Sequence, residues 1–486
     1  MAARESQSVV NVSKARAEQL LGAIQGKGGE DLDSALAKEK ARFEQAGQGQ
    51  VFDFLGRLDD AEKNALLEQC SGIDLERVEK LFQSTMVADA KGGAIDQDKV
   101  TPCNSAVTYD DANAKPETVA GAYEAIRKGE WAVLVLAGGA GSRLGWPGPK
   151  GEYCVHKGYF GHDASITGAE PVTGEWGTSL FELHCHRIMR LAELAGAESI
   201  PMLVMTSPNN HARTVAFFKA NDYFGLPGKE KQVTFFPQMM LPCMTNEGKI
   251  ILESKSKVAM APDGNGGIYA ALANSGALQK VKRQGVKSIH VICVDNALVK
   301  PVDPVFAGLC GASNFDCGSL VCPKREPHEK VGVLCLVGGK YNVLEYSEIS
   351  KENAEKRNDD GQLSFRAGNI CNHAYDVDFL EQKVIPNLGN TYHVARKKVA
   401  KADPETGLPV KPESNNGVKL EMFIFDIFPL SERMATLEVP RAENFAPVKV
   451  RLFRSVPFHS SVFLPLSFSL SLSLSLSLSL SLSLSI

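Results

Sequence analysis

The sequence predicts an α/β protein with a mostly parallel central sheet, a helical N-terminal region and an aberrant C-terminal region. Three observations support this fold class. From Trp131 onward, short β-rich apolar runs alternate with helical stretches, as in strands joined by crossover helices. Before that point, apolar residues recur at three- and four-residue spacing between charged residues. From Ser467 onward, serine alternates strictly with apolar residues, almost all of them leucine.

These changes in composition divide the 486 residues into four regions. We expect a helical region over 1–105, the main sheet domain over 106–400, a mixed region over 401–449 and a low-complexity Ser/Leu tail over 450–486. The helices of the first region carry no group of polar residues typical of a catalytic site. We therefore interpret this region as a packing or oligomerisation module without a catalytic role.

Each expected helix and strand follows from its local pattern. Residues 13–24, 31–46 and 60–70 have helical spacing. The predicted strands of the sheet domain are 131–137, 200–207, 232–238 and 288–296, with helices over 178–196, 209–221 and 268–285 between them. Further on, 330–349 is typical of a hairpin, and 420–428 of a buried strand or short helix. Ligands of such sheets bind beyond the carboxyl ends of the strands, so we expect the site in the loops there.

The tail has an explanation at the level of DNA. A CT dinucleotide repeat encodes alternating Leu and Ser, and the codon for Val450 begins with the GT of a splice donor. We interpret 450–486 as translated intron or low-complexity sequence rather than as an evolved domain. Unvaried alternation leaves the register of a strand unspecified, and the absence of charge makes the tail an aggregation hazard.

Composition excludes several classes of function. A net charge of −4 does not provide the basic field of a nucleic-acid binder. Eleven cysteines without a CxxC pair indicate free thiols in a reducing compartment. The sequence shows neither a secretory signal nor a run of about 18 apolar residues, so we expect a cytoplasmic enzyme without membrane or nucleic-acid partners.

The most informative stretch is VLVLAGGAGSRLGWPGPKG, residues 133–151. It follows a predicted strand, and its glycines let backbone N–H groups approach an anion without Cβ clashes. Arg143 offers a two-pronged donor for phosphate and Lys150 a compact charge. Together these features are typical of a polyphosphate site.

The stretch does not match either of two better-known phosphate-binding loops. The spacing from Gly141 to Gly145 is one residue too long for a dinucleotide fingerprint, and Pro147 and Pro149 break the helix that should follow. A P-loop requires Ser or Thr after its lysine, whereas Lys150 is followed by glycine. A dinucleotide-binding oxidoreductase is therefore a distant alternative.

The loop resembles the nucleotide-binding loop of eukaryotic UDP-N-acetylhexosamine pyrophosphorylases. Further similar segments follow in the same order and extend the resemblance over roughly residues 50–449: FFPQMMLPCM, GKIILESKSKVAMAPDGNGGIYAAL, VICVDNALVKPVDP, VGVLCLVGG, VLEYSEIS, FRAGNICNHAY, GVKLEMFIFDIF and ENFAPVK. The resemblance implies a Rossmann-like nucleotidyltransferase domain over 106–400, with 401–449 as the remnant of a C-terminal region that closes the site. It also implies the formation of UDP-N-acetylglucosamine and pyrophosphate from UTP and N-acetylglucosamine 1-phosphate with Mg²⁺.

The resemblance also implies residue roles. Backbone groups of Leu136, Ala137, Gly138 and Gly139 would cradle the nucleotide, Gln238 would read the uracil edge and Gly264 would lie against the base. Arg143 and Lys150 would hold the β- and γ-phosphates, and Lys419 and Lys449 would neutralise phosphate on the nucleotide and sugar sides. Asp295 would support Mg²⁺. The hexosamine would contact Asn265, Glu345, Tyr346 and Asn369, and its N-acetyl methyl group would contact Phe423 and Phe425.

The sequence departs from the family in three places. Residues 156–177 form a longer connection than the family has, which we expect to be a surface loop or a lid. Met239 follows Gln238 where the family has glycine, and would tighten the space beside the uracil. The family segment beyond FAPVK does not appear here, so Lys449 is the last matching residue and its catalytic role is in doubt.

Three readings of function remain open. We expect the N-acetylhexosamine enzyme, as a monomer or weak homodimer. A broader UDP-sugar pyrophosphorylase that uses glucose or galactose 1-phosphate is the nearest alternative. A catalytically impaired binder of UTP or UDP-sugar is the alternative from another class, because of the altered C-terminus.

Overall fold

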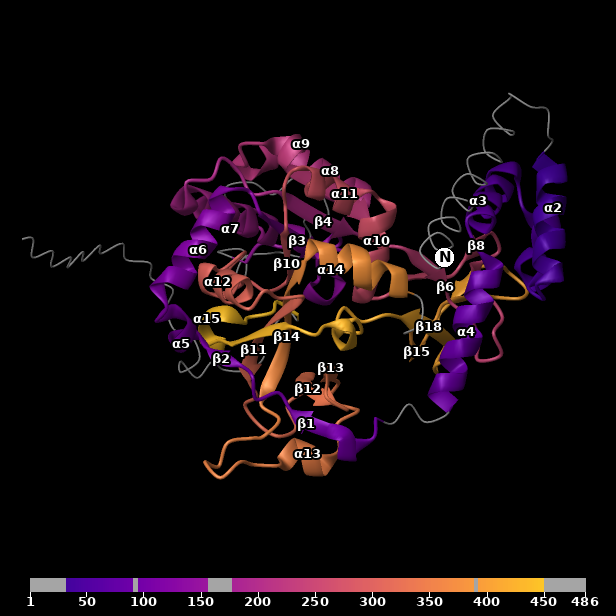
Figure 1. Cartoon of the computed structure of the whole chain (residues 1–486). Helices are drawn as coiled ribbons and strands as arrows, with labels where there is room; N and C mark the ends of the chain where they lie inside the picture. Colours follow the sequence, from indigo (N-terminus) through magenta and orange to yellow (C-terminus); the bar gives the residue numbers. More distant parts are fainter. Residues whose placement is uncertain (1–31, 91–94, 156–176, 389–391, 450–486) are drawn as a thin grey trace, which may run out of the picture. The chain divides into compact units, whose positions relative to one another are not determined.

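The structure, a computed structural model, describes residues 32–90, 95–155, 177–388 and 392–449. Its centre is a mixed sheet in which β10 (Ser288–Cys293), β3 (Trp131–Leu136), β4 (Met202–Thr206) and β5 (Val233–Pro237) run parallel in that spatial order. These are the four predicted strands of the sheet domain, with their bounds shortened by one to three residues. The mostly parallel α/β fold is confirmed (Figure 1).

An antiparallel strand interrupts the parallel order. β14 (Ala367–Asp376) lies between β10 and β11 (Cys317–Pro323) and is antiparallel to both. Beyond β11, β19 (Met434–Glu438) and β2 (Val107–Thr108) continue the sheet in parallel pairs. Periodicity gives the existence of strands but not their spatial order, so the position of β14 could not be predicted from the sequence.

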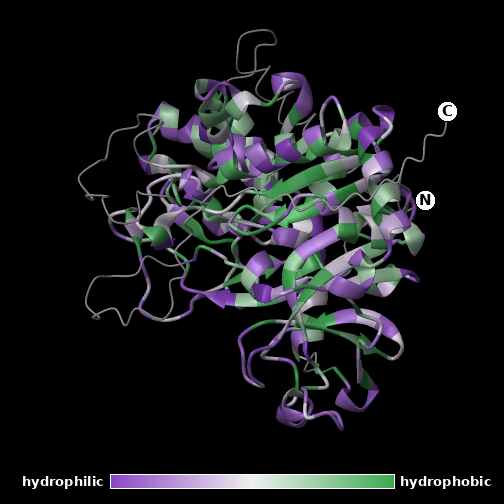
Figure 2. Cartoon of the chain, turned by 90° about the vertical axis from the view of Figure 1, so that its left-hand side faces the viewer, coloured by the Kyte–Doolittle hydropathy of each residue, from purple (hydrophilic) through white to green (hydrophobic). Residues whose placement is uncertain are grey.

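Helices cover both faces of the sheet. Alternate residues of β3 enter two different apolar cores, because side chains of a strand point to opposite faces. One core receives α6 (Pro116–Arg127), α7 (Leu180–Ala195) and α12 (Pro304–Ala312); the other receives α10 (Ile268–Asn274) and α11 (Ala277–Arg283). Burial on both sides explains the continuous apolar strands, which are green beneath more polar helices in Figure 2.

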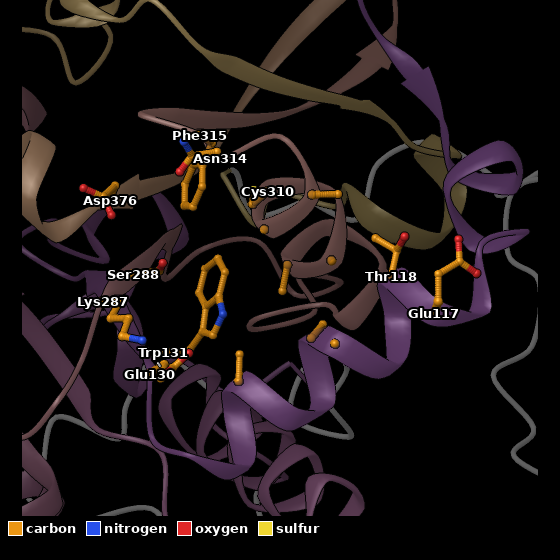
Figure 3. Close-up of a pocket in the computed structure, with 17 residues that line it drawn as sticks. Glu117, Thr118, Glu130, Trp131, Lys287, Ser288, Cys310, Asn314, Phe315 and Asp376 are labelled. Carbon is orange, nitrogen blue, oxygen red and sulfur yellow. Dashed lines mark hydrogen bonds and ion pairs between the residues drawn. The ribbon is translucent and has the colours of Figure 1, made fainter.

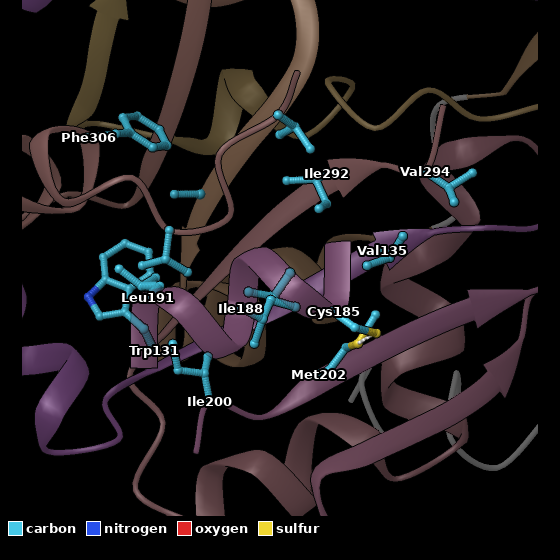
Figure 4. Packing of buried hydrophobic residues seen from close by; sticks show 14 of the residues in the cluster. Trp131, Val135, Cys185, Ile188, Leu191, Ile200, Met202, Ile292, Val294 and Phe306 are labelled. Carbon is cyan, nitrogen blue, oxygen red and sulfur yellow. Dashed lines mark hydrogen bonds between the residues drawn. The ribbon is translucent and has the colours of Figure 1, made fainter. Parts of the chain in front are cut away.

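Helix α7 shows how local sequence defines such a covering helix. Ser179 and Glu182 form a reciprocal capping box at its start, and Gly196 ends it in the left-handed conformation, with φ +65°. Its apolar residues Ile188 and Leu191 then pack on the sheet (Figure 4).

The predicted hairpin is confirmed. β12 (Val333–Val337) pairs with β13 (Lys340–Leu344), and β1 (Val100–Pro102) adds to its other side. The two-residue turn has Gly338 and Gly339 at φ +55° and +81°. Turns that match strand twist require positive φ at both positions, which glycine adopts without strain.

The N-terminal helices are α2 (Leu32–Gln45), α3 (Asp60–Ser71) and α4 (Leu75–Ala90). The first two were expected; the stretch 13–24 lies outside the described residues. Their apolar faces share a core with short strands that include β6 (Met240–Pro242), β9 (Met260–Pro262), β15 (His393–Lys397) and β18 (Gly417–Glu421).

The stretch 420–428 corrects an expectation. The strand β18 ends at Glu421, and the residues after it form turns before a short 3-10 helix over Phe428–Leu430. The backbone N–H groups of Phe423 and Ile424 donate to the side chains of Asp426 and Asn265 instead of to a neighbouring strand. These side-chain acceptors end the strand, and the second comes from far along the chain.

The remaining elements are short. They are α5 (Tyr109–Asn113), α8 (His211–Ala220), α9 (Lys229–Gln232), α13 (Lys351–Glu355), α14 (Val377–Phe379), α15 (Arg441–Asn444), β7 (Leu252–Ser254), β8 (Lys257–Val258), β16 (Lys401–Ala402) and β17 (Pro409–Val410). Across the described ranges, the structure contains no helix with the length and apolar character needed to cross a membrane. The 156–176 part of the long connection and the tail 450–486 lie outside the description.

Candidate active site

The glycine loop folds back on itself directly after β3. Gly141 N–H donates to the Gly148 carbonyl at 2.8 Å, and Lys150 N–H donates to the Gly139 carbonyl at 3.0 Å. Two short 3-10 helices, Ser142–Leu144 and Lys150–Glu152, stand where a dinucleotide fold would have its long helix. Pro147 and Pro149 were expected to prevent a long helix at this position.

The two cations of the loop have different surroundings. Lys150 Nζ lies 3.1 Å from Asp295 Oδ2, and both side chains are mostly buried. The contact arises because β3 and β10 are neighbouring parallel strands, so their following loops meet at one edge. Arg143 is exposed and has no ion pair with any residue that the structure describes. Its guanidinium is therefore available to an incoming anion.

Gly138 and Gln238 face each other across the ends of β3 and β5. A Cβ at Gly138 would lie 2.2 Å from Gln238 Oε1, so a side chain there would displace the Gln238 amide. Gln238 is buried, and its N–H donates to the Thr206 carbonyl at 2.8 Å. Asn210, which sequence analysis did not single out, supports the loop by donating from Nδ2 to the Ala137 carbonyl at 3.0 Å. Leu136 and Ala137 are buried at the strand end, and Gly139 has open space where a side chain would stand.

The APDGNGG segment packs against the turn after β18. Gly264 has φ +89°, and a Cβ there would lie 2.3 Å from the Met422 carbonyl oxygen. Asn265 Oδ1 accepts from the Ile424 N–H at 3.0 Å, and its Nδ2 lies 3.8 Å from Cys371 Sγ. The structure thus gives Gly264 a packing role against Met422 and shows Asn265 bound to the chain itself.

The predicted apolar wall is present beside Asn265. Phe423 and Phe425 stack with ring centroids 5.2 Å apart, and the ring of His393 lies 4.6 Å from that of Phe423. His393 Nε2 is 3.0 Å from Asp426 Oδ1. Burial lowers the pKa of His393, but the hydrogen bond and charge of Asp426 outweigh it, so the pKa is raised overall.

Three of the predicted sugar-side residues lie on or just after strands: Asn369 is on β14, and Glu345 and Tyr346 follow the end of β13. Asn369 Oδ1 accepts from the Cys371 N–H at 3.0 Å on β14. Burial raises the pKa of Glu345, against the opposing charges of His393 and Lys449. Tyr346 is 51% exposed and is not seen to hydrogen-bond to the other described site residues. Glu345 and Asn369 are therefore inside the site, whereas Tyr346 is at its surface.

A C-terminal strap, residues 444–449, fastens Lys449 beside Asp295. Asn296, which is buried, donates from Nδ2 to the Asn444 carbonyl at 2.8 Å and accepts from the Ala446 N–H at 3.0 Å. Val448 N–H donates to the Asp295 carbonyl at 2.9 Å. Hydrogen bonds of residues 444–448 thus hold the backbone next to Lys449 at the loop after β10, which carries Asp295.

Lys419 lies on β18, three residues before Met422, which packs against Gly264. It is opposite Ala395 in the β15–β18 pair, and its charge acts on Cys243. The structure shows no contact between Lys419 and the described part of the glycine loop.

Sequence reasoning missed a group of three side chains that holds the loop, here called the loop clamp: Trp146, Glu152 and Arg213. Glu152 is only 3% exposed and pairs with Arg213, with Nη2 and Oε2 2.7 Å apart. Trp146 Nε1 donates to Glu152 Oε2 at 3.2 Å, and Arg213 Nη1 donates to the Pro147 carbonyl at 3.2 Å. Glu152 near Lys150 was visible in the sequence, but nothing there linked it to Arg213 on α8.

One carboxylate is suitably placed for Mg²⁺. The described residues contain no group of three or more His, Cys, Asp or Glu side chains that could hold a metal ion. Mg²⁺ commonly binds through one or two carboxylates together with substrate phosphates and water. Asp295, at a strand end and next to two lysines, fits that type of site.

A separate cavity lies at the opposite end of the strands (Figure 3). Its lining includes Trp131 and Ser288, the first residues of β3 and β10, with Phe315 and Asp376. The glycine loop and Asp295 follow the last residues of the same strands. This cavity is therefore distinct from the candidate site.

Known proteins share this fold and sequence. The family model described as UTP–glucose-1-phosphate uridylyltransferase matches residues 75–452. The fold, site and match define an α/β uridylyltransferase.

Individual relatives narrow the class. A Xenopus tropicalis protein named UDP-N-acetylhexosamine pyrophosphorylase-like protein 1 is 40% identical over 434 residues, which are 86% of this chain and 81% of that protein. The Saccharomyces cerevisiae UDP-N-acetylglucosamine pyrophosphorylase is 36% identical, over 85% of this chain and 86% of its own. The Trypanosoma brucei uridine diphosphate N-acetylglucosamine pyrophosphorylase, solved with an inhibitor, has a TM-score of 0.70 and 29% identity, covering 86% of this chain and 81% of its own. The chain belongs to the UDP-N-acetylhexosamine pyrophosphorylase family.

Proposed function

We propose that this chain joins UTP to N-acetylglucosamine 1-phosphate, forming UDP-N-acetylglucosamine and pyrophosphate, with Mg²⁺ as cofactor. Family membership supports the uridylyl transfer. The observation that supports the assignment most strongly is the meeting of Lys150, Asp295 and the strap bearing Lys449 at one edge of the sheet. A phosphoryl-transfer site requires this kind of concentrated, positioned charge.

In this mechanism the protein supplies position and charge. A sugar phosphate is already ionised, so its oxygen attacks the α-phosphorus of UTP in line without a general base. Arg143 and Lys150 hold the β- and γ-phosphates and stabilise the departing pyrophosphate. Gln238 presents an amide donor and acceptor to the uracil edge. Mg²⁺, held by Asp295 and phosphate oxygens, would neutralise charge beside the α-phosphate.

Substrate binding requires an exchange of partners at the Lys150–Asp295 pair. Without substrate, the ammonium and the carboxylate neutralise each other at 3.1 Å. With UTP and Mg²⁺ bound, Lys150 would pair with phosphate oxygens, and Asp295 would be free to hold the cation. Each charge then has a partner of opposite sign in both states, so neither is left unpaired in a mostly buried position.

The hexosamine is held on the other side of Asp295. We assign Asn265, Glu345 and Asn369 to its polar groups and the stacked rings of Phe423 and Phe425 to its N-acetyl methyl. Only an N-acetylated sugar gains the apolar contact with those rings. A methyl-sized contact in a hydrophobic pocket gives about 10- to 200-fold discrimination.

A competition assay tests the assignment. Equal concentrations of N-acetylglucosamine 1-phosphate and glucose 1-phosphate compete for UTP, and the UDP-sugars are quantified by mass spectrometry. We expect UDP-N-acetylglucosamine to predominate. Equal amounts of both products would replace the proposal with a broader pyrophosphorylase. Thermal stabilisation by UTP without any product would indicate a binder that does not catalyse.

A further inference from the structure

Two cysteines lie close to each other on neighbouring strands beneath the sugar side of the site. In the β10–β14 ladder, Ser288 pairs with Asp376 and Val291 with His373. Cys293 and Cys371 lie two residues beyond the last pair of this ladder, on the same two strands. Cys293 Sγ lies 3.7 Å from the Cys371 carbonyl oxygen. Directly opposed antiparallel residues have Cα atoms about 4.5–5.5 Å apart, within the roughly 4.4–6.8 Å that a disulfide spans.

These two thiols differ from the other cysteines in access. All eleven cysteines are free and lie in the described part of the chain, and nine of them are buried. Only Cys293 and Cys371 are partly exposed. An oxidant that enters the site therefore meets this pair before any other thiol.

The backbone at Cys371 is strained. Its φ is +53°, in the left-handed region that residues other than glycine rarely adopt. The bond from its N–H to Asn369 Oδ1 holds this conformation where the pairing of β14 with β11 shifts register. Such strain concentrates at functional positions, because the surroundings must maintain it.

The surroundings of Cys371 favour its thiolate. Asn265 Nδ2 lies 3.8 Å from its sulfur as a possible donor. The side chain of Cys293 also interacts with that of Cys371, which places the two thiols next to each other. The thiolate is the form of cysteine that reacts with oxidants.

We propose that Cys293 and Cys371 are a redox modification site that a hydroperoxide closes into a disulfide, which switches off the enzyme. The Cys371 thiolate attacks one peroxide oxygen, the O–O bond breaks, and a sulfenic acid and hydroxide form. Cys293 sulfur then attacks the sulfenic sulfur; the S–O bond breaks and the second hydroxide leaves. The thiol protons convert both hydroxides to water, so two thiols are oxidised and one peroxide is reduced.

The disulfide changes the site on two sides. Cys293 precedes Asp295 by two residues, and Cys371 follows Asn369 by two. Bonding to Cys293 also takes the Cys371 sulfur away from the Asn265 amide. We therefore expect oxidation to displace the sugar-side contacts, which must be held within about 0.5 Å of their productive positions to support catalysis.

The test treats the full chain with hydrogen peroxide and maps unreduced peptides by mass spectrometry. We expect a peptide pair joined through Cys293 and Cys371, and a roughly tenfold or greater fall in pyrophosphate release that dithiothreitol reverses. Cys371→Ala and Cys293→Ala should each retain their own untreated activity under peroxide. Cys103→Ala, at a buried thiol away from the site, is the matched control and should lose activity as the wild type does.

Each contrary result has a defined meaning. Absence of the joined peptides, or equal inactivation of Cys371→Ala, would overturn the proposal. If the disulfide forms and activity is unchanged, the proposal that oxidation switches off the enzyme is wrong. The activity readout rests on the proposed function, whereas peptide mapping does not. If the reduced chain releases no pyrophosphate, that result contradicts the proposed function. Peptide mapping then still tests whether the disulfide forms.

Discussion

At the scale of single residues, the site contains two cationic side chains with different surroundings. One has an ion pair, and the other has none among the described residues. Lys150 is paired with Asp295, whereas Arg143 projects from a short helix without an ion pair among the described residues. The pattern in the sequence predicted both charges but not this difference, because the partner of Lys150 lies 145 residues away. Arg143 is therefore the cleaner probe of phosphate binding.

Replacement of Arg143 should remove activity without unfolding the chain. Arg143→Ala is expected to lower turnover by roughly 10²–10³, because one preorganised charge partner of the leaving group is lost. Pyrophosphate release measures the effect, and circular dichroism checks the fold. Arg190→Ala, at an exposed arginine on α7, is the matched control and should keep wild-type turnover. Near-normal turnover of folded Arg143→Ala would refute the role.

Asp263 should make stability depend on pH. Burial raises the pKa of its carboxyl to about 7, and one of its oxygens has no hydrogen-bond partner. A carboxyl that titrates near 3.9 when unfolded then binds more protons in the folded state. Its contribution is complete below that unfolded pKa and is lost as the pH rises through about 7. We expect this contribution to lower Tm as the pH rises from about 4 to 7 in the wild type and to be absent in Asp263→Asn. Parallel Tm profiles would contradict this.

At the scale of elements, local sequence predicted strands and covering helices well. The apolar runs that became β3, β4 and β10 are buried on both faces, β5 is partly buried, and a capping box begins α7. The turn after β18 was mispredicted because Asn265 and Asp426 accept its N–H groups. Side-chain acceptors from distant segments leave no periodic signal.

The loop clamp should position the glycine loop. Arg213→Met leaves the buried Glu152 carboxylate with only Trp146 and frees the Pro147 carbonyl. We expect turnover to fall about tenfold as the loop loses its fixed geometry, with a smaller loss in Arg213→Lys. Lys219→Met, at an exposed ion pair on the same helix, serves as the control. If Arg213→Met matched that control in pyrophosphate release, the clamp would have no catalytic role.

At the scale of the whole molecule, the sheet brings together segments that are far apart in sequence. The loops after β3 and β10 and the strap before Lys449 meet because their strands or contacts share one sheet edge. The resemblance placed most of these residues in one site, and the structure brings Lys150, Asp295 and Lys449 together. The roles of Lys419 and Tyr346 stay predictions, because a motif does not define the surroundings of a side chain.

The strap provides a prediction at this scale. Asn296→Ala removes two of the bonds that tie residues 444–446 to the loop after β10, leaving the Asn444 carbonyl and the Ala446 N–H without these partners. We expect a loss of about 1–3 kcal/mol in the free energy of unfolding, measured by urea denaturation. Turnover measured well below Tm should also fall, because the strap that carries Lys449 is held by fewer bonds. Unchanged turnover in a folded variant would confine the strap to stability.

The most direct test of the account is pyrophosphate release by this chain, tail included, with UTP, Mg²⁺ and N-acetylglucosamine 1-phosphate. The account predicts steady release that depends on all three components and exceeds the release seen with glucose 1-phosphate. Thermal stabilisation by UTP without any release would contradict it, because the nucleotide side would then be formed while the catalytic assembly around Asp295 and Lys449 would not.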